Sequence, residues 1–462
     1  MFKTLQSIML LMLMLSFTAQ AQKVAYLGQV LHFTGDPSQA TNPQDAYQYF
    51  EKGALIVDKG KVVKVGIASE LDALIKQSKV IDYKDKLIIP GFIDTHIHYP
   101  QTEMIAAFGE QLLDWLKKYT FPAEKQFSDK AYAKDVSDIF LHQLLSNGTT
   151  TALVFGTVHP ESVDALFSQA KSLDMRLIAG KVMMDRNAPD YLLDTAKSSY
   201  DETKALIQKW HNKDRLLYAI TPRFAPTSTP EQLTAAGQLK EEFPDTWVHT
   251  HLSENKGEIE WVKSLFPDRK SYTDVYDFYK LTSDKSIFAH SIHLDDDEVA
   301  TLASTGSSIA FCPTSNLFLG SGLFKLSTMK EAGVRVGLGT DVGAGTSFSM
   351  LETLNEAYKI IQLQNQKLSA FEGFYLATLG GAKSLSLDQY IGNFETGKEA
   401  DFVVIDWGGT PFQAYRQSKT TSLHEKLFVL MTIGDDRNIH ATYVMGKKQF
   451  EQGMAHPATK SL

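Results

Sequence analysis

Short apolar runs alternate with amphipathic stretches through the middle of the chain. The runs are rich in Val, Ile, Leu, Phe and Ala, as in buried parallel strands, and the stretches between them, such as 162–167 and 233–239, carry apolar residues at helical spacing. Eight strand–helix units predict a (β/α)8 TIM-type barrel, although periodicity alone leaves an open doubly wound sheet as an alternative. The eight strands are predicted at 87–93, 151–155, 177–182, 216–220, 247–251, 286–290, 308–312 and 334–339.

Both ends of the chain follow a different pattern, in which the apolar runs are typical of a β-rich region. The polar turn Asp58-Lys59-Gly60-Lys61 lies between two such runs and predicts a hairpin. Strands are expected at 24–27, 30–33, 54–57, 62–65, 400–405 and 441–447. We therefore predict a small β-sandwich domain built from both chain ends. Its N-terminal part is residues 22–86, the barrel is residues 87–385, and its C-terminal part is residues 386–462.

The first 21 residues have the features of a secretory signal peptide. Lys3 precedes the apolar run 8–15, and Ala19-Gln20-Ala21 is a small-x-small cleavage pattern. The run is too short to span a membrane as a helix, so we favour a signal peptide at 1–21 over an uncleaved anchor or a buried N-terminal helix. The one cysteine, Cys312, is not at the cleavage site, which excludes a lipoprotein. We expect an exported enzyme, periplasmic or secreted, with no membrane attachment after cleavage.

Composition narrows the classes of partner. The chain has 462 residues, of which 43% are hydrophobic and 22% charged, which are ordinary values for a globular protein. Its formal net charge of −8, without an evident basic patch, argues against nucleic acid as a partner. We therefore expect a small-molecule substrate.

Two histidines end the first predicted barrel strand. His96 and His98 are two residues apart, so both side chains project from one face of a strand and can bind one metal ion. Two core histidines satisfied by hydrogen bonds are the alternative for this motif taken alone. The ends of the other predicted strands favour the metal site, because they supply the polar residues Arg223, His251, Glu254, His290 and Asp341.

Three neutral imidazoles and one carboxylate form a compact site for a divalent ion such as zinc, with one position left for water. Such an ion lowers the pKa of its water to about 7, which makes hydroxide available at neutral pH. The predicted ligands are His96, His98, His251 and Asp341.

The remaining polar residues at the strand ends suggest acid–base chemistry. Glu254 can take a proton from the water and pass it on, and His290 can orient the hydroxide. Asp341 can also orient it and pass a proton to the leaving group. His249 lies two residues deeper on its strand and is interpreted as a packed interior histidine. The fourth strand ends in Arg223 rather than in a lysine that could bridge two ions, so we favour a single metal ion.

Several motifs of the chain resemble the amidohydrolase superfamily, in its mononuclear-zinc aminohydrolase branch. These motifs are PGFIDTHIH at 90–98, HLSE at 251–254, AH at 289–290 and GLGTD at 337–341. Within that branch the chain is most similar to the guanine deaminases, over about residues 23–450. The resemblance is carried by residues 98–101, 113–124, 147–151, 221–224, 316–322, 377–382, 391–394 and 434–439.

The resemblance implies hydrolytic removal of the 2-amino group of guanine, giving xanthine and ammonia, as in purine catabolism or salvage. It implies one zinc ion per chain, although iron accepts the same ligands, and a homodimer. Gln101 and Arg223 would hold the purine through its carbonyl and ring nitrogens, and Phe224 would stack on or flank the ring. The other residues expected at the substrate are His98, His251, Glu254 and Asp341.

Other functions stay open at this point. A related aminohydrolase could use the same chemistry on a pterin, 8-oxoguanine or a triazine, because Tyr99, Thr314 and the pair Ile292-His293 are expected near the pocket and could change the ring that fits. A catalytically silent purine-binding barrel is a more remote alternative. A glycosidase based on paired carboxylates is disfavoured, since the strand ends supply histidines where it would need acids.

Overall fold

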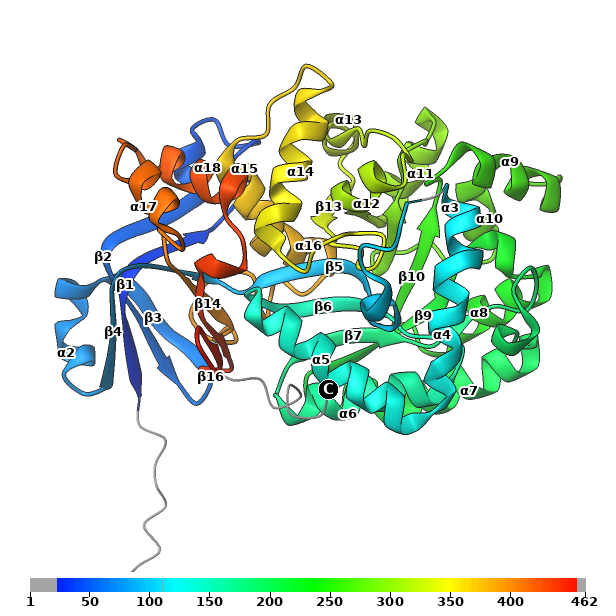
Figure 1. The fold of residues 1–462 in the computed structure, drawn as a ribbon, viewed down its shortest axis with the longest axis horizontal. Helices are drawn as coiled ribbons and strands as arrows, with labels where there is room; N and C mark the ends of the chain where they lie inside the picture. The colour runs from blue at the N-terminus through cyan, green and yellow to red at the C-terminus, as the bar shows by residue number, and fades with distance from the viewer. Residues whose placement is uncertain (1–22, 110, 455–462) are drawn as a thin grey trace, which may run out of the picture.

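The larger of two sheets is a parallel barrel (Figure 1). The computed structural model describes residues 23–109 and 111–454. Eight strands of these residues neighbour one another in chain order, and a short strand, β8 (Val182–Met183), also pairs with β9. The eight are β5 (Phe92–His98), β6 (Thr149–Phe155), β7 (Arg176–Gly180), β9 (Leu216–Pro222), β10 (Trp247–Leu252), β11 (Ser286–His290), β12 (Ser308–Phe311) and β13 (Arg335–Leu338).

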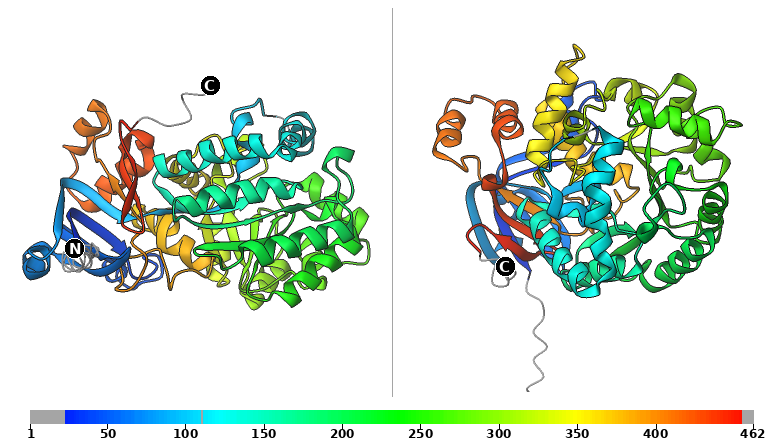
Figure 2. Two further views of the ribbon diagram at one scale, coloured as in Figure 1. Left: turned by 90° about the horizontal axis from the view of Figure 1, so that it is seen from below. Right: turned by 45° about the vertical axis from the view of Figure 1, so that its right-hand side comes forward.

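The first and last strands are joined by hydrogen bonds just beyond the end of β13. The amide of Asp341 donates to the carbonyl of His96 at 2.9 Å, and the amide of His98 donates to the carbonyl of Val342 at 2.8 Å. These bonds bring the two ends of the sheet together, so the predicted barrel is confirmed and the open doubly wound alternative is wrong. The right-hand view of Figure 2 shows the helices arranged around the barrel.

Two of the predicted barrel strands join segments that the structure divides. The run 87–93 is divided, because Leu87–Pro90 ends strand β4 (Lys79–Pro90) of the smaller sheet and the barrel begins only at Phe92. The run 177–182 is divided between β7 and β8 at Lys181. In both places the apolar pattern continues while the chain changes its hydrogen-bonding partners, and periodicity cannot report that change.

Most helices cover the outside of the barrel and bury their apolar faces against its strands, whereas α2 packs on the smaller sheet. Most of the longer ones begin at side-chain caps, as where Asp129 accepts hydrogen bonds from Ala131 and Tyr132 at the start of α5, but α6 begins at Pro160 without such a cap. The helices are α2 (Asp72–Ile75), α3 (Leu112–Trp115), α4 (Phe121–Glu124), α5 (Lys130–Ser146), α6 (Pro160–Ser172), α7 (Ala196–Trp210), α8 (Pro230–Glu242), α9 (Lys256–Leu265), α10 (Tyr272–Phe278), α11 (Asp296–Thr305), α12 (Pro313–Phe318), α13 (Leu326–Glu331), α14 (Met350–Gln362), α15 (Ala370–Tyr375), α16 (Gly381–Ser384), α17 (Pro411–Gln417) and α18 (Leu423–Ile433).

The smaller sheet has seven strands and combines both ends of the described chain, as the sequence predicts. Lys59 and Gly60 form the predicted hairpin turn between β2 and β3, and both have the positive φ that a tight two-residue turn needs. The strands lie in the order β16 (Lys447–Glu451), β15 (Ile439–Val444), β14 (Phe402–Ile405), β4, β1 (Val24–Phe33), β2 (Tyr47–Asp58) and β3 (Lys61–Ile67).

A buried cluster of ion pairs joins the N-terminal ends of two barrel strands to the smaller sheet. Arg176, at the start of β7, donates to both carboxylate oxygens of Glu399 at 2.8 and 2.6 Å. Arg215, just before β9, donates to Glu399 at 2.6 and 3.0 Å and also to Asp401. Burial alone would raise the pKa of Glu399, but the two guanidinium groups outweigh it and lower the pKa to about 2.

Within residues 23–109 and 111–454, none of the helices combines the length and the apolar character that crossing a bilayer requires.

Substituting Glu399→Gln should lower thermal stability at pH 7, because Arg176 would lose the carboxylate that it binds and Arg215 would keep only Asp401. A carboxylate with a lowered pKa contributes stability that is present above its ordinary pKa of 4.5 and is lost as the pH falls towards 2. We expect a loss of about 3 kcal/mol at pH 7. The melting temperatures of the two proteins should differ by a constant amount above about pH 5 and converge as the pH falls from 4.5 towards 2.

Circular dichroism melts across this pH range check the prediction, with the exposed Glu70→Gln as the control that leaves the melting temperature unchanged. A difference between Glu399→Gln and the unmodified protein that does not shrink as the pH falls would contradict it.

Candidate active site

The predicted polar residues meet at the C-terminal ends of the barrel strands. His96 and His98 lie on β5 and His251 on β10, while His290 ends β11 and Asp341 follows β13. Side chains that alternate along a strand place both β5 histidines on the inner face. His290 and Asp341 have φ of 66° and 52°, a region that non-glycine residues rarely adopt and that often marks functional sites.

The predicted ligand atoms lie close to one another. The Nε2 atom of His98 lies 3.2 Å from that of His96 and 3.3 Å from that of His251. Oδ1 of Asp341 lies 3.1 Å from Nε2 of His96 and 3.3 Å from Nε2 of His98. Ligands bound to zinc at about 2.0–2.1 Å lie about 3.3–3.4 Å apart along the edges of a tetrahedron. The four separations match such edges, so the predicted ligands lie close enough together to share one metal ion.

Hydrogen bonds on the far side of two rings leave their Nε2 lone pairs available to a metal. Nδ1 of His251 donates to the carbonyl of Arg223 at 2.7 Å, which places the proton on Nδ1. Nδ1 of His96 lies 2.8 Å from Nε2 of His249. With His96 as the donor, His249 is the acceptor that fixes the tautomer and orientation of the His96 ring. His249 is thus buried, as expected of an interior histidine, and it also contacts a predicted ligand.

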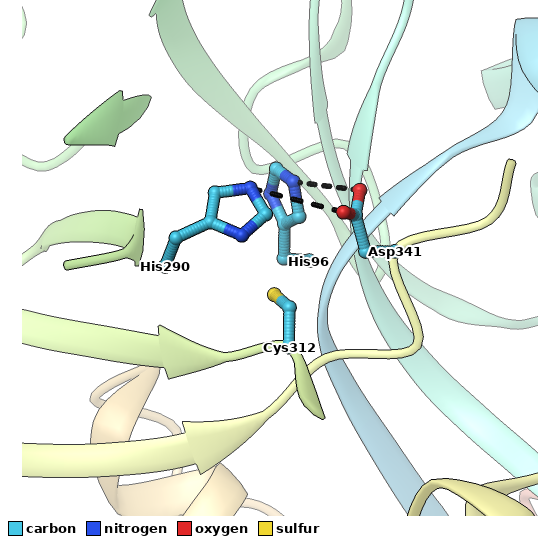
Figure 3. Close-up of side chains that lie close together, drawn as sticks. All are labelled: His96, His290, Cys312 and Asp341. Carbon is cyan, nitrogen blue, oxygen red and sulfur yellow. Dashed lines mark ion pairs between the residues drawn. The ribbon is translucent and has the colours of Figure 1, made fainter. Parts of the chain in front are cut away.

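A second group of possible ligands overlaps the first. His96, His290, Cys312 and Asp341 converge in Figure 3, where His96 and His290 approach the two oxygens of Asp341. Nε2 of His290 lies 3.7 Å from Oδ2 of Asp341 and 3.5 Å from Oε2 of Glu254. Nδ1 of His290 donates to Oδ1 of Asn316 at 2.9 Å, so its Nε2 faces both carboxylates as an acceptor in the neutral ring.

Burial sets the protonation of the cluster. Desolvation lowers the pKa of His98 to about 3 and lowers those of His96 and His251, which keeps the three rings neutral, as metal ligands must be. Burial would raise the pKa of Asp341, but the adjacent histidines outweigh this effect and hold the pKa of the carboxyl well below its ordinary value. Burial, together with Asp341, raises the pKa of Glu254 to about 8, so this carboxyl can hold a proton at neutral pH.

A pocket opens over this cluster and holds the predicted substrate residues. Gln101, Arg223 and Phe224 line it together with histidines and carboxylates of the cluster. The described residues that line it are His98, Gln101, Leu112, Trp115, Leu116, Arg223, Phe224, His251, Glu254, His290, Leu319, Asp341 and Ala344. Charged and hydrogen-bonding groups thus lie between apolar walls, as in sites that bind flat, polar rings.

The four residues that the sequence expects near the pocket do not line it. Tyr99 points into the core, where its hydroxyl donates to the carbonyl of Ser162 at 2.7 Å. His293 donates to the carbonyl of Ser321, and Thr314 lies in a separate cleft beside Leu317. Ile292 is also absent from the described lining. The first residues after a strand can turn away from the barrel axis, and sequence position does not show which of them do.

Sequence reasoning missed four residues that support the site. Glu124 binds Arg223, Asn316 accepts from His290, and Ser321 donates to Glu254 at 3.1 Å. The fourth, Trp115, lines the pocket, and its indole Nε1 has no partner among the described residues. All four lie in the family-like segments 113–124 and 316–322, but neither segment follows a ligand motif, so no chemical role could be read from them.

Residues 87–448 match the model of the amidohydrolase family. The guanine deaminase of Escherichia coli K12 is 61% identical over 415 residues, which cover 89% of this chain and 94% of that protein. The chain belongs to the guanine deaminase branch of the amidohydrolase family. A probable guanine deaminase of Deinococcus radiodurans is 39% identical and covers 91% of this chain and 97% of its own length. The family resemblance found in the sequence is therefore confirmed.

Solved structures of this amidohydrolase branch share the whole fold. The E. coli guanine deaminase superposes with a TM-score of 0.91 at 59% identity, covering 93% of this chain and 99% of its own. A guanine deaminase from C. acetobutylicum, with guanine bound in its active site, superposes with a TM-score of 0.84 at 31% identity, covering 93% of this chain and 100% of its own.

The comparisons contradict the prediction of an exported enzyme. The E. coli and D. radiodurans relatives match over 94% and 97% of their own lengths, and these relatives are cytoplasmic enzymes. The expectation of a periplasmic or secreted protein is corrected on this ground. Residues 1–21, from which the signal peptide was predicted, lie outside the described residues.

Substituting His249→Phe should weaken metal binding by about 10–100-fold, because His96 would lose the acceptor that orients its ring. Phenylalanine retains a ring of similar size, so packing beside Phe155 should be preserved. Metal content after dialysis against graded chelator, measured by plasma mass spectrometry, checks this expectation. His440→Phe makes the same change in the smaller sheet and should leave metal affinity unaltered. Equal metal retention by both variants would remove His249 from the support of the site.

Proposed function

We propose that this chain is a metal-dependent hydrolase that converts guanine and water to xanthine and ammonia. The observation that carries the proposal is the 61% identity to E. coli guanine deaminase across 89% of the chain. The geometry supports the same reaction, because the metal-ligand cluster faces Arg223, Gln101 and Phe224 within one pocket. Purine catabolism or salvage is the corresponding cellular role.

We propose one zinc ion per chain, held by three imidazole nitrogens and one carboxylate oxygen. The separations of 3.1–3.3 Å between neighbouring donor atoms support a compact site for one divalent ion. The ion, when bound, would supply an acidified water as the nucleophile. Iron accepts the same donors, so the ligand set supports a divalent ion more strongly than it supports zinc in particular. The proposed ligands are His96, His98, His251 and Asp341.

The substrate side of the pocket is suited to a purine ring. Arg223 presents a guanidinium fork, which matches the O6 and N7 acceptors at one edge of guanine. Gln101 adds a carboxamide beside it, and the ring of Phe224 offers an aromatic face for stacking. We propose that these three residues place the 2-amino group of guanine over the metal-ligand cluster, beside the side chains of His98, His251, Glu254 and Asp341.

Three residues would move or hold protons in this reaction. Glu254, in its ionised form, would take a proton from the attacking water and deliver it to the ring, and its raised pKa of about 8 makes it a stronger base for that first transfer. Nε2 of His290, facing Glu254 and Asp341, would hold the water in the direction of attack. Asp341 would pass a proton to the departing amine, which leaves as ammonia.

Two features of organisation accompany this proposal. We propose that the two chain ends form one small domain beside the barrel, as predicted for 22–86 and 386–462, with the first boundary moved from 87 to Pro90, where β4 of the continuous seven-stranded sheet ends. We also propose a homodimer, for which the family resemblance is the support.

Purified protein loaded with zinc should release ammonia from guanine in preference to pterin, 8-oxoguanine and cytosine. The expectation rests on the purine-edge donors of Arg223 and Gln101, and a coupled ammonia assay with each compound measures it. A chelator should abolish release, and zinc should restore it. If ammonia were released only from pterin or 8-oxoguanine, the hydrolytic deamination would stand and the choice of guanine as the substrate would be wrong.

Substituting Glu254→Gln should retain the metal while turnover falls by about 10²–10⁴-fold, since a carboxamide cannot accept and return the proton. Steady-state kinetics with parallel metal analysis would measure both quantities. Glu260→Gln, on the exposed face of α9, is the matched control and should turn over guanine normally. Near-normal kcat in Glu254→Gln would exclude this residue from proton transfer.

A further inference from the structure

A fully buried carboxylate lies directly behind the substrate side of the pocket. Glu124, the last residue of α4, has no exposed surface and does not line the pocket itself. Its two oxygens accept hydrogen bonds from Nη1 of Arg223 at 2.8 and 3.0 Å. Its Oε1 also accepts from Nε2 of Gln101 at 3.4 Å. Glu124 therefore contacts both of the polar residues that we propose for holding the purine.

The contact with Glu124 restricts how Arg223 can bind a ligand. Both of its hydrogen bonds to Glu124 use Nη1, which leaves the N–H groups of Nη2 and Nε for a ligand. A free arginine side chain has several rotatable bonds, and ordering it on binding opposes association. Because Glu124 already holds the guanidinium in the free protein, that ordering is complete before a ring arrives.

The same carboxylate determines which way the Gln101 carboxamide points. A carboxylate oxygen accepts hydrogen bonds and donates none, so the NH₂ end of Gln101 must face Glu124. The oxygen of Gln101 faces the other way, where the amide of Gly343 donates to it at 3.3 Å. The two contacts fix the carboxamide in one of its two flipped orientations, so the pocket presents a defined pattern of donors and acceptors.

Glu124 also balances charge in a region from which water is excluded. Arg223 is 2% exposed and Glu124 is fully buried, so an unpaired guanidinium there would be strongly disfavoured. The pair has no net charge, which suits an uncharged ring such as guanine. Replacing such a buried pair by apolar residues often preserves or raises stability, so stability alone does not explain why these two charges lie here.

We propose that Glu124 is a positioning residue for substrate recognition, which acts by holding Arg223 and Gln101 in the arrangement that binds the purine edge. The proposal rests on the function proposed above. Glu124 touches neither the ring nor the metal ligands, so its effect reaches the substrate through the two residues it holds. Disturbing it should therefore change substrate binding far more than metal binding.

A double-mutant cycle of Glu124→Gln and Arg223→Gln tests this route. For guanine, Glu124→Gln should lower kcat/KM by about 10–100-fold, with KM raised and the metal content unchanged. Residues that act through one another give non-additive effects. In the Arg223→Gln background, the added Glu124→Gln should therefore lower kcat/KM by clearly less than it does in the unmodified protein, and the loss that remains is carried by its contact with Gln101. Glu124→Asp, which keeps the charge on a shorter arm, should recover part of the lost activity.

The control is Glu298→Gln, which makes the same change at a nearly buried carboxylate on α11, outside the pocket. Its kinetics should match those of the unmodified protein. Additive losses in the double variant, an unchanged KM in Glu124→Gln, or metal loss in that variant would each overturn the inference. If Glu124→Gln does not fold, the cycle is measured with Glu124→Asp, for which additive losses have the same meaning. An unmodified enzyme without guanine turnover would instead overturn the proposed function.

Discussion

Closure of the barrel between its first and last strands is the constraint on which the site depends. Two backbone hydrogen bonds join β5 to the residues after β13, and they place Asp341 directly beside His96 and His98. Asp94 strengthens this junction, because its carboxylate accepts from the amide of His96 at 3.2 Å and from Thr340 at 3.1 Å. A carboxylate more than two hundred residues distant in the chain thus becomes a neighbour of two histidines.

Buried arginine–carboxylate pairs occur at both ends of the barrel and serve different purposes. At the N-terminal end, Arg176 and Arg215 bind Glu399 and hold the smaller sheet against the strands. At the C-terminal end, Arg223 binds Glu124 but keeps part of its guanidinium directed elsewhere. The first cluster satisfies its charges within the protein, whereas the second leaves donors for a ligand. Both clusters are buried, so they differ in whether N–H donors of an arginine remain unused.

Hydrogen bonds to groups behind the pocket fix which nitrogen of two imidazoles carries the proton. Neutral imidazoles can carry a proton on either nitrogen, and only an outer partner fixes the choice. The carbonyl of Arg223 does this for His251, and Asn316 does it for His290. Arg223 therefore links the two sides of the site, because its carbonyl orients a proposed ligand while its side chain lines the substrate pocket.

The sequence by itself determined the fold class and most of the residues around the pocket. Local patterns carry that information: apolar runs give the strands, and polar residues at their ends, such as His96, His251 and Asp341, become neighbours once eight parallel strands close. Only the tertiary structure decided where the apolar run at 87–93 changes sheets, that Tyr99 turns into the core, and that Glu124 lies behind Arg223. These outcomes depend on contacts between residues distant in the chain, and residue spacing contains no record of them.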